Sequence, residues 1–490
     1  MPDISPSLER VKEYAKNFPC CPVYRRIAET ARGPLEVFKA LKRLSRHCYI
    51  LESLENADGR GRYTFLGYDP KLEVSCSDGV LKIKNGAEME FKTDKPGGYI
   101  AKIIADNATP VLAELPPFSG GLVGYFAYEY IKYSEKSLDF GGGGEGFKDV
   151  DLMLFDKVIA YDHEKKEIIL IVNIKTAEAD ENYNKAAFEL DYIENVLRNG
   201  QTAEPPRLKL KSEFAGLFDE AGYCDMVVRA KAHIKEGDIF QVVPSNVYSA
   251  EACGSLFDVY RAMREINPSP YMFYFSSDAL EIAGASPETL VRLNDGRVTT
   301  YPLAGTRRRG VTDDEDRLLE RELLSDEKEL AEHNMLVDLG RNDIGKISKF
   351  GSVRVDKYLN IERFSHVMHI ASEVTGELRD GLTAIDAIEA ILPAGTLSGA
   401  PKIRAVQIIN DLEKNRRGIY GGAIGYLSLS GSMDTCIAIR IAYKKDGRVF
   451  VRSGAGVVAD SVPKNEYEEC KNKAAAVLKA IKNCAEAGGI

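Results

Sequence analysis

The sequence predicts an α+β fold built on large antiparallel sheets, and it disfavours a doubly wound parallel sheet. Residues 72–91, LEVSCSDGVLKIKNGAEMEF, carry Asp-Gly and Asn-Gly turns between alternating apolar positions, a pattern typical of β-hairpins. Residues 152–174 are interpreted as another strand pair, with a turn at 162–166. Residues 422–458 are interpreted as three strands joined by tight glycine-containing turns, which together form an antiparallel meander.

Helices are expected over 180–198, 326–340 and 464–483. After the first of them, residues 199–216 combine glycine, two prolines and mixed charge, as linkers do. We therefore predict an N-terminal region over 1–205 and a second region over 206–490. The similar segments GGLVGYFAYE at 120 and GGAIGYLSLS at 421 suggest two sheets entered in a similar way. A common hairpin-entry pattern explains this similarity equally well.

The bulk composition is that of an ordinary globular protein. Of its 490 residues 44% are hydrophobic and 28% charged, and the net charge of −9 argues against general binding to nucleic acid or to an anionic membrane. The N-terminus has no apolar stretch typical of a signal peptide, and no run is long enough to span a membrane. Nine cysteines without a CxxC pair favour a reduced, cytoplasmic chain, and tryptophan is absent.

Two of the predicted helices carry pairs of carboxylates. In 464–483, Glu466, Glu469 and Lys473 are spaced i, i+3 and i+7, beside an apolar stripe that must face the core. A solvated face with an ion pair explains this spacing if the helix is taken alone. Glu329 and Glu332 form an i, i+3 pair in the earlier helix, and two such pairs could hold Mg²⁺, which prefers oxygen ligands. The sequence leaves open whether the two helices meet.

Glycine-rich segments supply candidate anion sites. SGAGVV at 453–458 follows an apolar strand, and LPAGTLSGAPK at 392–402 leads into a helix, so backbone amides could converge on a carboxylate at either place. Glycines also serve ordinary turns, and each motif alone is weak. YPLAGTRRRG at 301–310 is interpreted as an anion-binding turn, because glycine, threonine and three arginines follow an apolar run. His366 and His369 are three residues apart, and a structural or acid–base role is favoured over a metal pair.

Taken together, these motifs resemble those of the chorismate-utilising enzymes, most closely the anthranilate synthase large subunits. The resemblance is dense over roughly residues 225–482 and thinner over about 35–130. It implies a two-sheet sandwich with helices on the outside and an active site in the cleft. The stretches that carry it are GDIFQVVPS, NPSPYMFYF, GASPETL, PLAGTRRRG, ELAEHNMLVDLGRND, VMHIASEVTGEL, GTLSGAPK, YGGAIGY, DTCIAIR and GAGVVADSVPKNEYEE.

The resemblance also implies roles for individual residues. Glu332 and Glu469 would ligate a Mg²⁺ cofactor that clamps the ring carboxylate of chorismate, with support from Glu329 and Glu466. Cations, hydroxyls and backbone amides would hold the substrate, which explains how an acidic protein binds a dianion. The implied substrate-binding residues are Gly305, Thr306, Thr396, Tyr420, Arg440, Gly454, Ala455, Gly456 and Lys473.

The implied chemistry is amination followed by elimination. Glu288 matches the residue that protonates the ring C4 hydroxyl as ammonia attacks C2, and this role requires a raised carboxyl pKa. His369 matches a residue implicated in the later loss of pyruvate, and Thr396 belongs to the same catalytic set.

Two positions select among members of the family. Members that add water carry a lysine where this chain has Gln241, and an amide cannot serve as that base. Aminodeoxychorismate synthases typically carry a nucleophilic lysine where this chain has Ala304, so C2 is left open to ammonia. Anthranilate formation is therefore expected, and aminodeoxychorismate synthesis or a non-catalytic tryptophan-sensing module are the alternatives. The chain contains no amidotransferase unit, which implies a separate glutamine amidotransferase subunit in a hetero-oligomer.

Two further stretches resemble the family's tryptophan feedback site. YILESLE in the N-terminal region supplies Leu51, Glu52 and Ser53, and NPSPYMFYF supplies Pro270, Tyr271 and Met272. An indole needs an apolar, aromatic slot, and its ammonium and carboxylate need a few polar partners. Taken alone, YILES would be interpreted as the end of a strand, and NPSPY as a turn that enters a buried strand. Inhibition by L-tryptophan is expected, and the absence of tryptophan suits an enzyme made when that amino acid is scarce.

Overall fold

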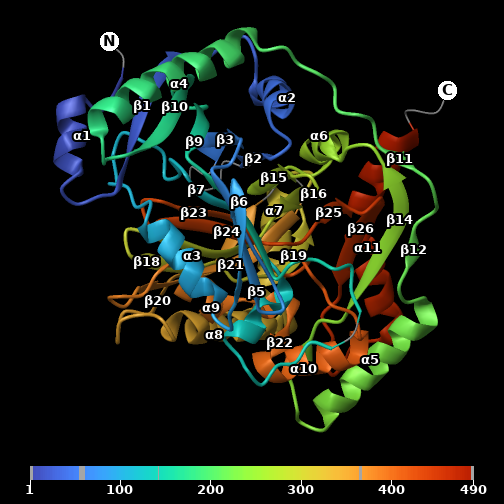
Figure 1. Ribbon diagram of the computed structural model, residues 1–490. Helices are drawn as coiled ribbons and strands as arrows, with labels where there is room; N and C mark the ends of the chain where they lie inside the picture. The colour runs from blue at the N-terminus through green and yellow to red at the C-terminus, as the bar shows by residue number, and fades with distance from the viewer. Residues whose placement is uncertain (1–3, 55–60, 142, 364–366, 487–490) are drawn as a thin grey trace.

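The computed structural model describes residues 4–54, 61–141, 143–363 and 367–486, and it has four layers, helices–sheet–sheet–helices (Figure 1). Each of the two sheets has 12 strands among the described residues, and the paired strands within them are antiparallel. The predicted α+β class, with two antiparallel sheets and helices outside, is confirmed. None of the described helices is long and apolar enough to cross a membrane.

The first sheet packs its outer face against α1 (Leu8–Tyr14), α2 (Pro34–Leu44), α4 (Ala179–Asn199), α6 (Phe257–Ile266) and α11 (Pro463–Glu486), and α5 (Glu220–Lys235) lies against α11. Its strands run in the order β1 (Cys20–Ala28), β10 (Glu167–Lys175), β9 (Lys157–Asp162), β3 (Tyr63–Tyr68), β2 (Cys48–Glu52), β15 (Tyr271–Ser276), β16 (Leu280–Ser286), β25 (Ile441–Lys445), β26 (Arg448–Gly454), β14 (Ser245–Cys253) and β11 (Lys209–Leu210), with β12 (Ala215–Gly216) beside β14.

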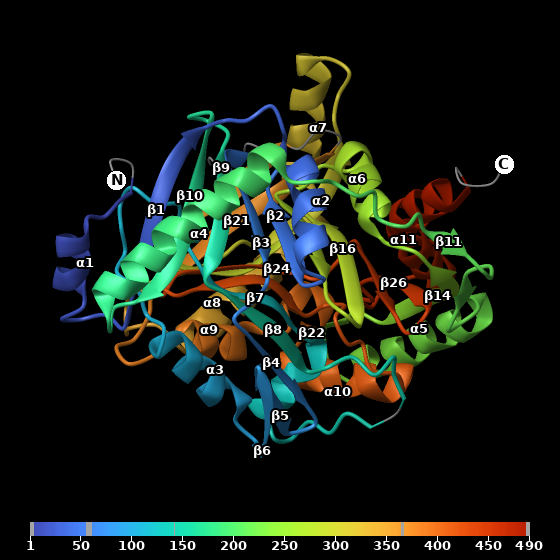
Figure 2. The same cartoon turned by 45° about the horizontal axis from the view of Figure 1, so that its top comes forward.

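The second sheet is covered by α3 (Pro96–Ala105), α8 (Glu327–Gly345) and α9 (Ala384–Ile391), which lie at the lower left in Figure 2. The helix α7 (Asp313–Ser325) contacts β19, β21 and α8, and α10 (Lys402–Glu413) contacts α5 and a small sheet in which β13 (Gln241–Val242) pairs with β22 (Gly399–Ala400). The strand order is β19 (Leu303–Arg308), β21 (Val367–Glu377), β18 (Arg297–Thr300), β17 (Thr289–Asn294), β24 (Met433–Ile437), β23 (Ala423–Ser428), β7 (Gly121–Phe126), β8 (Val150–Phe155), β4 (Leu72–Ser77), β5 (Val80–Asn85) and β6 (Ala87–Lys92), with β20 (Arg354–Arg363) beside β21.

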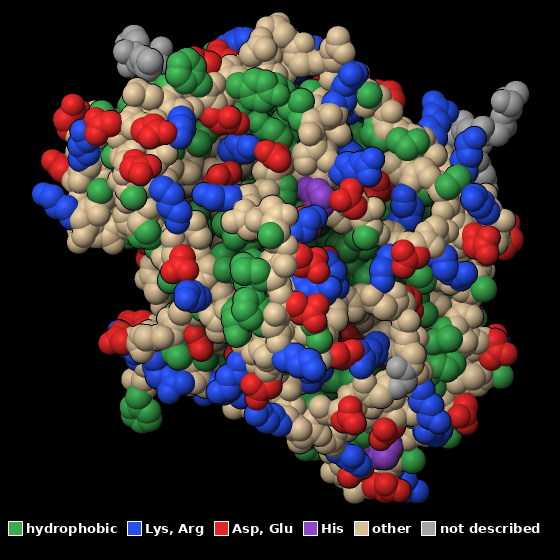
Figure 3. All heavy atoms as spheres, viewed as in Figure 1, with side chains coloured by type: hydrophobic (Ala, Val, Ile, Leu, Met, Phe, Trp, Pro, Cys, Tyr) green, Lys and Arg blue, Asp and Glu red, His purple; other side chains and the backbone are tan. Residues whose placement is uncertain are grey.

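The hairpins expected from Asp-Gly and Asn-Gly turns form as predicted. Asp78 and Gly79 both have positive φ between β4 and β5, as the tightest hairpin turn requires, and Gly86 has positive φ between β5 and β6. Charged side chains of both signs are interspersed on the face viewed in Figure 3, in keeping with the modest net charge.

Both predicted regions contribute strands to both sheets. In each sheet, strands from the two regions meet at a central pair, β2 with β15 and β7 with β23. Aromatic residues from both regions fill the space between the sheets, among them Phe118, Tyr125 and Phe273. The boundary at 205/206 stays a prediction, and the residues from 200 to 208 connect α4 to β11 without helix or strand.

One strand assignment was wrong, and one of two open alternatives is ruled out. The predicted meander over 422–458 is two hairpins in different sheets, because the chain leaves β24 of the second sheet at Ile437 and enters β25 of the first at Ile441. Arg440, with φ of 53°, breaks the strand between them, although CIAIRIAY has a continuous strand pattern. The similar segments at 120 and 421 form adjacent strands of one sheet, with Gly124 paired to Gly425, and do not enter two sheets.

Candidate active site

A cavity of about 620 Å³ gathers almost every residue expected at the active site. It opens between β19 and β21 on one side and β26 and α11 on the other, with α8 and the segment 396–397 forming further walls. The predicted residues that line it are Gln241, Glu288, Ala304, Gly305, Thr306, Glu329, Glu332, His369, Thr396, Tyr420, Arg440, Gly454, Gly456, Glu466, Glu469 and Lys473.

The two carboxylate pairs do meet. Glu329 and Glu332 come from α8, and Glu466 and Glu469 from α11, and all four line the cavity. Burial raises the pKa of Glu332, and the charges of Glu329 and Glu469 raise it further. Burial raises the pKa of Glu466 as well. Lys473 Nζ lies 2.6 Å from Glu469 Oε1 and offsets part of this negative charge. The four carboxylates supply oxygen donors of the kind that a hard divalent cation prefers, but no three of their oxygens lie within 4.8 Å of one another, so binding a cation there requires the side chains to draw together.

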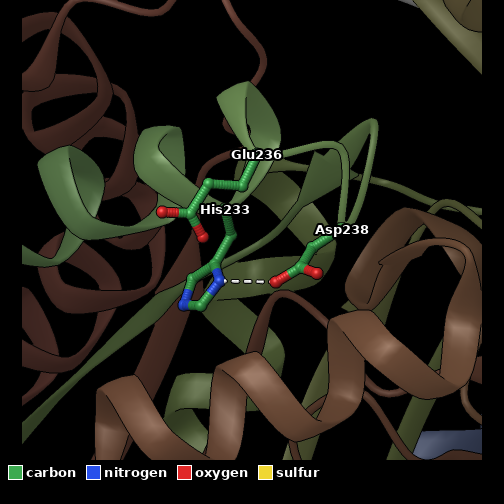
Figure 4. A group of neighbouring side chains, drawn as sticks. All are labelled: His233, Glu236 and Asp238. Atoms are coloured by element: carbon green, nitrogen blue, oxygen red, sulfur yellow. Dashed lines mark hydrogen bonds and ion pairs between the residues drawn. The ribbon is translucent and has the colours of Figure 1, made fainter.

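Among the described residues, three potential ligand atoms lie within 4.8 Å of one another only in the group His233, Glu236 and Asp238 (Figure 4). This group stands at the end of α5, outside the cavity. His233 Nδ1 is 2.8 Å from the Asp238 carboxylate, and Arg404 donates to the same oxygen at 2.7 Å. Asp238 is thus already paired with two bases, and the group is a surface ion-pair cluster.

Glu288 follows β16 and faces the cavity as a buried carboxyl. Burial raises its pKa to about 7, against partial opposition from a hydrogen bond to Thr396 and from the charge of Lys473. Thr396 Oγ1 donates to Glu288 Oε1 at 2.9 Å. A carboxyl with this pKa is partly protonated at neutral pH and can therefore donate a proton.

His369 lies on β21 opposite a bulge in β19. The register slips between Ala304 and Thr306, where Gly305 has φ of 65°, and the slip turns the Gly305 carbonyl to within 2.9 Å of His369 Nδ1. Thr306 Oγ1 is 3.0 Å from the same nitrogen. Burial lowers the pKa of His369, so the neutral imidazole is favoured. His366, the other histidine of the predicted pair, falls outside the described residues.

Arg440 stands where the chain crosses between the sheets. Its left-handed backbone conformation ends the strand pattern and lets its side chain line the cavity, where Nη1 donates to the Lys473 carbonyl at 3.3 Å. Burial lowers its pKa from the usual arginine value. Tyr420 and the Gly454 backbone line the cavity near it. Cations and small residues from three separate elements thus converge on one side of the cavity.

Two expectations at the site were wrong. Ala455 does not line the cavity: its methyl group is buried against α5 and α10, and its amide donates to the Pro244 carbonyl at 3.2 Å. The segment 301–310 is mostly strand β19 and not an anion-binding turn. Its arginines pair with carboxylates of α7 and α8 and their junction, for instance Arg307 with Asp326 at 2.8 Å and Arg309 with Asp316 at 2.6 Å.

Sequence reasoning missed some wall residues, chiefly Lys328 and Arg452. Lys328 precedes Glu332 by four residues on α8, so helical spacing could have placed it on the same face. Arg452 is buried and donates to Glu413 at 3.2 Å, and no sequence signal marks it. At the floor, a Cβ on Gly456 would come within 2.9 Å of Gln241 Nε2.

A second cavity, of about 190 Å³, lies between the two sheets and is lined by Leu51, Glu52, Ser53, Pro270, Tyr271 and Met272. The two sequence stretches are therefore brought together as expected. Tyr271 Oη donates to Asp434 at 2.7 Å and lies 2.8 Å from Thr289 Oγ1. The Glu52 carboxylate accepts from Arg264 of α6 at 3.0 Å.

Comparison with known proteins agrees with this geometry. Residues 47–479 match the family model described as chorismate binding enzyme. The chain is 45% identical to "Anthranilate synthase component 1" of Acetivibrio thermocellus, over 98% of this chain and 99% of that protein, and 43% identical to the protein of the same name from Methanothermobacter thermautotrophicus, over 92% of each. A crystal structure of anthranilate synthase component I from Streptococcus pneumoniae TIGR4 superposes with a TM-score of 0.75 at 39% identity, covering 85% of this chain and 92% of that one.

The fold extends to more distant proteins. The menaquinone-specific isochorismate synthase of Escherichia coli has a TM-score of 0.68 at 18% identity, and the superposition covers 97% of this chain and 98% of that one. At this identity the likeness concerns the fold alone.

Proposed function

The chain belongs to the chorismate binding enzymes, within the group of anthranilate synthase component 1 proteins, and on that premise we propose how its cavity forms anthranilate from chorismate and ammonia. The observation that carries the proposal is Glu288, a buried carboxyl with a pKa raised to about 7 in a cavity that also holds cations and four further carboxylates. This arrangement suits a dianionic substrate that must lose a hydroxyl group.

Chorismate would lie with one carboxylate toward Arg440, Lys473 and Tyr420, next to the backbone of Gly454 and Gly456. Burial strengthens the contacts of Tyr420 and the half-buried Arg440, because little water competes for them, whereas the Lys473 side chain is more exposed. The ring carboxylate would then point to the four glutamates. That end of the cavity is acidic, so it requires a cation between the carboxylates.

Mg²⁺ is the cation we propose, held by Glu332 and Glu469 with Glu329 and Glu466 beside them. When bound, it would supply positive charge that binds and polarises the ring carboxylate. Burial raises the pKa of Glu332 and Glu466, and the charges of neighbouring glutamates raise it further; this supports the assignment, since a divalent cation would offset the repulsion between the carboxylates. His369, neutral and anchored by the Gly305 carbonyl, is placed to assist the loss of pyruvate.

Glu288 would protonate the departing C4 hydroxyl as ammonia adds to C2. Gln241 supports an ammonia position, because its buried side-chain oxygen has no hydrogen-bond partner among the described residues and can accept from an ammonia N–H. Ala304, in the same cavity, leaves C2 without a competing amine. Gln241 thus favours ammonia over water as the nucleophile, and Ala304 favours anthranilate over the aminodeoxychorismate product.

Ammonia would come from a glutamine amidotransferase subunit, since the relatives are named component 1 of their enzyme. The test is product fluorescence from chorismate with the purified chain. Ammonium salts should support turnover that depends on Mg²⁺, and glutamine should support it only after an amidotransferase subunit is added. Turnover with glutamine and this chain alone would contradict the proposal that ammonia comes from a separate subunit. At constant free ammonia, kcat/KM should fall above about pH 7 as Glu288 ionises.

The smaller cavity we assign to L-tryptophan as feedback inhibitor. Its wall is connected to the catalytic acid: Tyr271 contacts Thr289, which is next to Glu288 in the chain. A ligand that displaces Tyr271 would therefore shift Glu288. Calorimetric titration tests this assignment, and an absence of binding together with unaffected activity at millimolar tryptophan would remove it.

We also propose a cytoplasmic location, on the basis of the cysteines. All nine cysteines are free thiols, as expected for a chain kept in a reducing compartment. Resistance of the folded protein to loss of activity under strong reductant would agree with this.

A further inference from the structure

Each sheet consists of two halves related by an approximate two-fold rotation. In the first sheet the order from the centre outward is β2, β3, β9, β10, β1 on one side and β15, β16, β25, β26, β14 on the other. Every strand of one series has its counterpart at the same place in the other. The chain order is also the same in both series: the outermost strand, β1 or β14, comes first, and the other four follow from the centre outward. The second sheet repeats the relation, with β7, β8, β4, β5 facing β23, β24, β17, β18.

Strand register fixes which residues are equivalent. Where a two-fold axis passes between two facing residues, those two residues are each other's counterparts, and we place the axis between Gly124 and Gly425 in the second sheet and between Ile50 and Tyr274 in the first (Figure 1, where β2 and β15 adjoin). Gly124 and Gly425 also share an unusual φ, 153° and 157°. Counting outward from Ile50 and Tyr274, Ser53 corresponds to Ser277.

The small cavity assigned above therefore has a counterpart position, and a cavity of about 460 Å³ lies there. Tyr426 pairs with Asp434 in the first cavity, and Tyr125 pairs with Asp151 in the second, by the same register. The second cavity also contains Ser277, the counterpart of Ser53.

The wall of the second cavity has its own chemistry. Tyr125 and Phe275 are buried and give it an aromatic floor, and burial raises the pKa of Asp151. Lys148 Nζ contacts the Asp151 carboxylate at 3.0 Å from a half-exposed position at the rim. His47, which occupies the position of Tyr271, lies 3.6 Å from Glu73.

We propose that this second cavity binds a free amino acid with an aromatic side chain. Its ammonium group would pair with Asp151, its side chain would pack on Tyr125 and Phe275, and its carboxylate would meet Lys148 at the rim. A carboxylate beside an aromatic floor selects a cation with an apolar body, and a rim lysine selects a second group that is anionic. An aromatic amino acid combines all three features. The proposal rests on this lining and goes beyond the function assigned to the first cavity.

The test uses the full chain and two matched substitutions at equivalent positions. Ser53→Phe fills the first cavity and Ser277→Phe fills the second, so each controls for the other. Because the chain contains no tryptophan, added L-tryptophan is the sole source of indole fluorescence, and its anisotropy reports binding directly. L-phenylalanine and L-tyrosine are measured by equilibrium dialysis.

We expect the Ser53→Phe protein to bind at least one of the three amino acids. Adding Ser277→Phe should abolish that binding, and adding Asp151→Asn should weaken it at least about tenfold, as loss of a charged partner does. If Asp151→Asn fails to fold, Lys148→Met replaces it and should also weaken binding, because it removes the proposed partner of the amino acid's carboxylate. Ammonia-dependent turnover should stay unchanged in the Ser277 and Lys148 variants, which shows that they are folded.

The proposal is overturned if the Ser53→Phe protein binds none of the three at millimolar concentration, or if binding persists in both the Ser277→Phe and Asp151→Asn backgrounds. These outcomes do not decide whether the first cavity binds L-tryptophan as a feedback inhibitor. That assignment fails if wild-type inhibition by L-tryptophan is absent or survives Ser53→Phe, whatever the second cavity does.

Discussion

Replacing Glu288 with glutamine should stabilise the protein at alkaline pH while it removes turnover. In the folded chain, burial raises the Glu288 pKa to about 7 from a reference value of 4.5. The folded carboxyl is therefore neutral between these values, whereas the same carboxyl in the unfolded chain is ionised. Stability is lost as pH rises through this window, because the folded state binds the proton more tightly.

The magnitude follows from the shift. One pKa unit corresponds to about 1.4 kcal/mol, so an ionised Glu288 costs the folded state about 3 kcal/mol above its folded pKa. Glutamine has nearly the same shape and no charge, so it escapes this cost. The free energy of unfolding of the variant should match that of the wild type only below about pH 4, exceed it by about 1 kcal/mol near pH 5, and exceed it by about 3 kcal/mol near pH 8.

Urea unfolding of both proteins, without substrate or Mg²⁺, measures the difference. Asp94→Asn is a suitable control: a hydrogen bond from exposed Lys136 lowers the Asp94 pKa, so this carboxylate is ionised throughout the range and its effect should not change with pH. A Glu288→Gln difference that stays constant from about pH 5 to about pH 8 would refute the raised pKa and, with it, the proton-donor role.

Other substitutions test the remaining parts of the site. Ala304→Lys places a long amine in the cavity and should reduce ammonia-dependent anthranilate formation at least about tenfold; unchanged turnover in the folded variant would contradict the specificity argument. Glu332→Gln and Glu469→Gln should each raise the Mg²⁺ requirement by at least about tenfold with an unaltered circular dichroism spectrum, and near-normal turnover at limiting Mg²⁺ would rule out the metal assignment. Ser53→Phe or Tyr271→Ala should relieve inhibition by L-tryptophan and leave catalysis in place, as measured by turnover with and without the amino acid.

Local patterns predicted the elements and, through the resemblance, most of the site. The hairpin turns at Asp78–Gly79 and Gly86 depend on neighbouring residues alone, so they could be foreseen. The carboxylate pairs could be placed on their helices by spacing. Their meeting could not be derived this way, because it depends on how α8 and α11 pack on different sheets.

The errors arise because contacts between segments distant in the chain override local patterns, and a strand pattern in particular does not say which sheet a strand joins. CIAIRIAY alternates as one strand would, yet Arg440 takes a left-handed conformation and the chain changes sheets there. Ala455 lies in a glycine-rich segment typical of anion sites, but its methyl group is needed in the packing of α5 and α10. The arginines of 307–309 are engaged by carboxylates that follow later in the chain.

The central pairing of the two halves has a consequence for how the chain must be made. When the ribosome has produced β1 to β10, strands β2 and β7 are the open edges of two unfinished sheets, and their backbone amides and carbonyls lack partners. β15 and β23 emerge only in the second half of synthesis. Until then the nascent half carries exposed, mostly apolar edges of the kind that pair with other chains. The first half of the chain is therefore expected to be prone to association through β2 and β7 until β15 and β23 cover them.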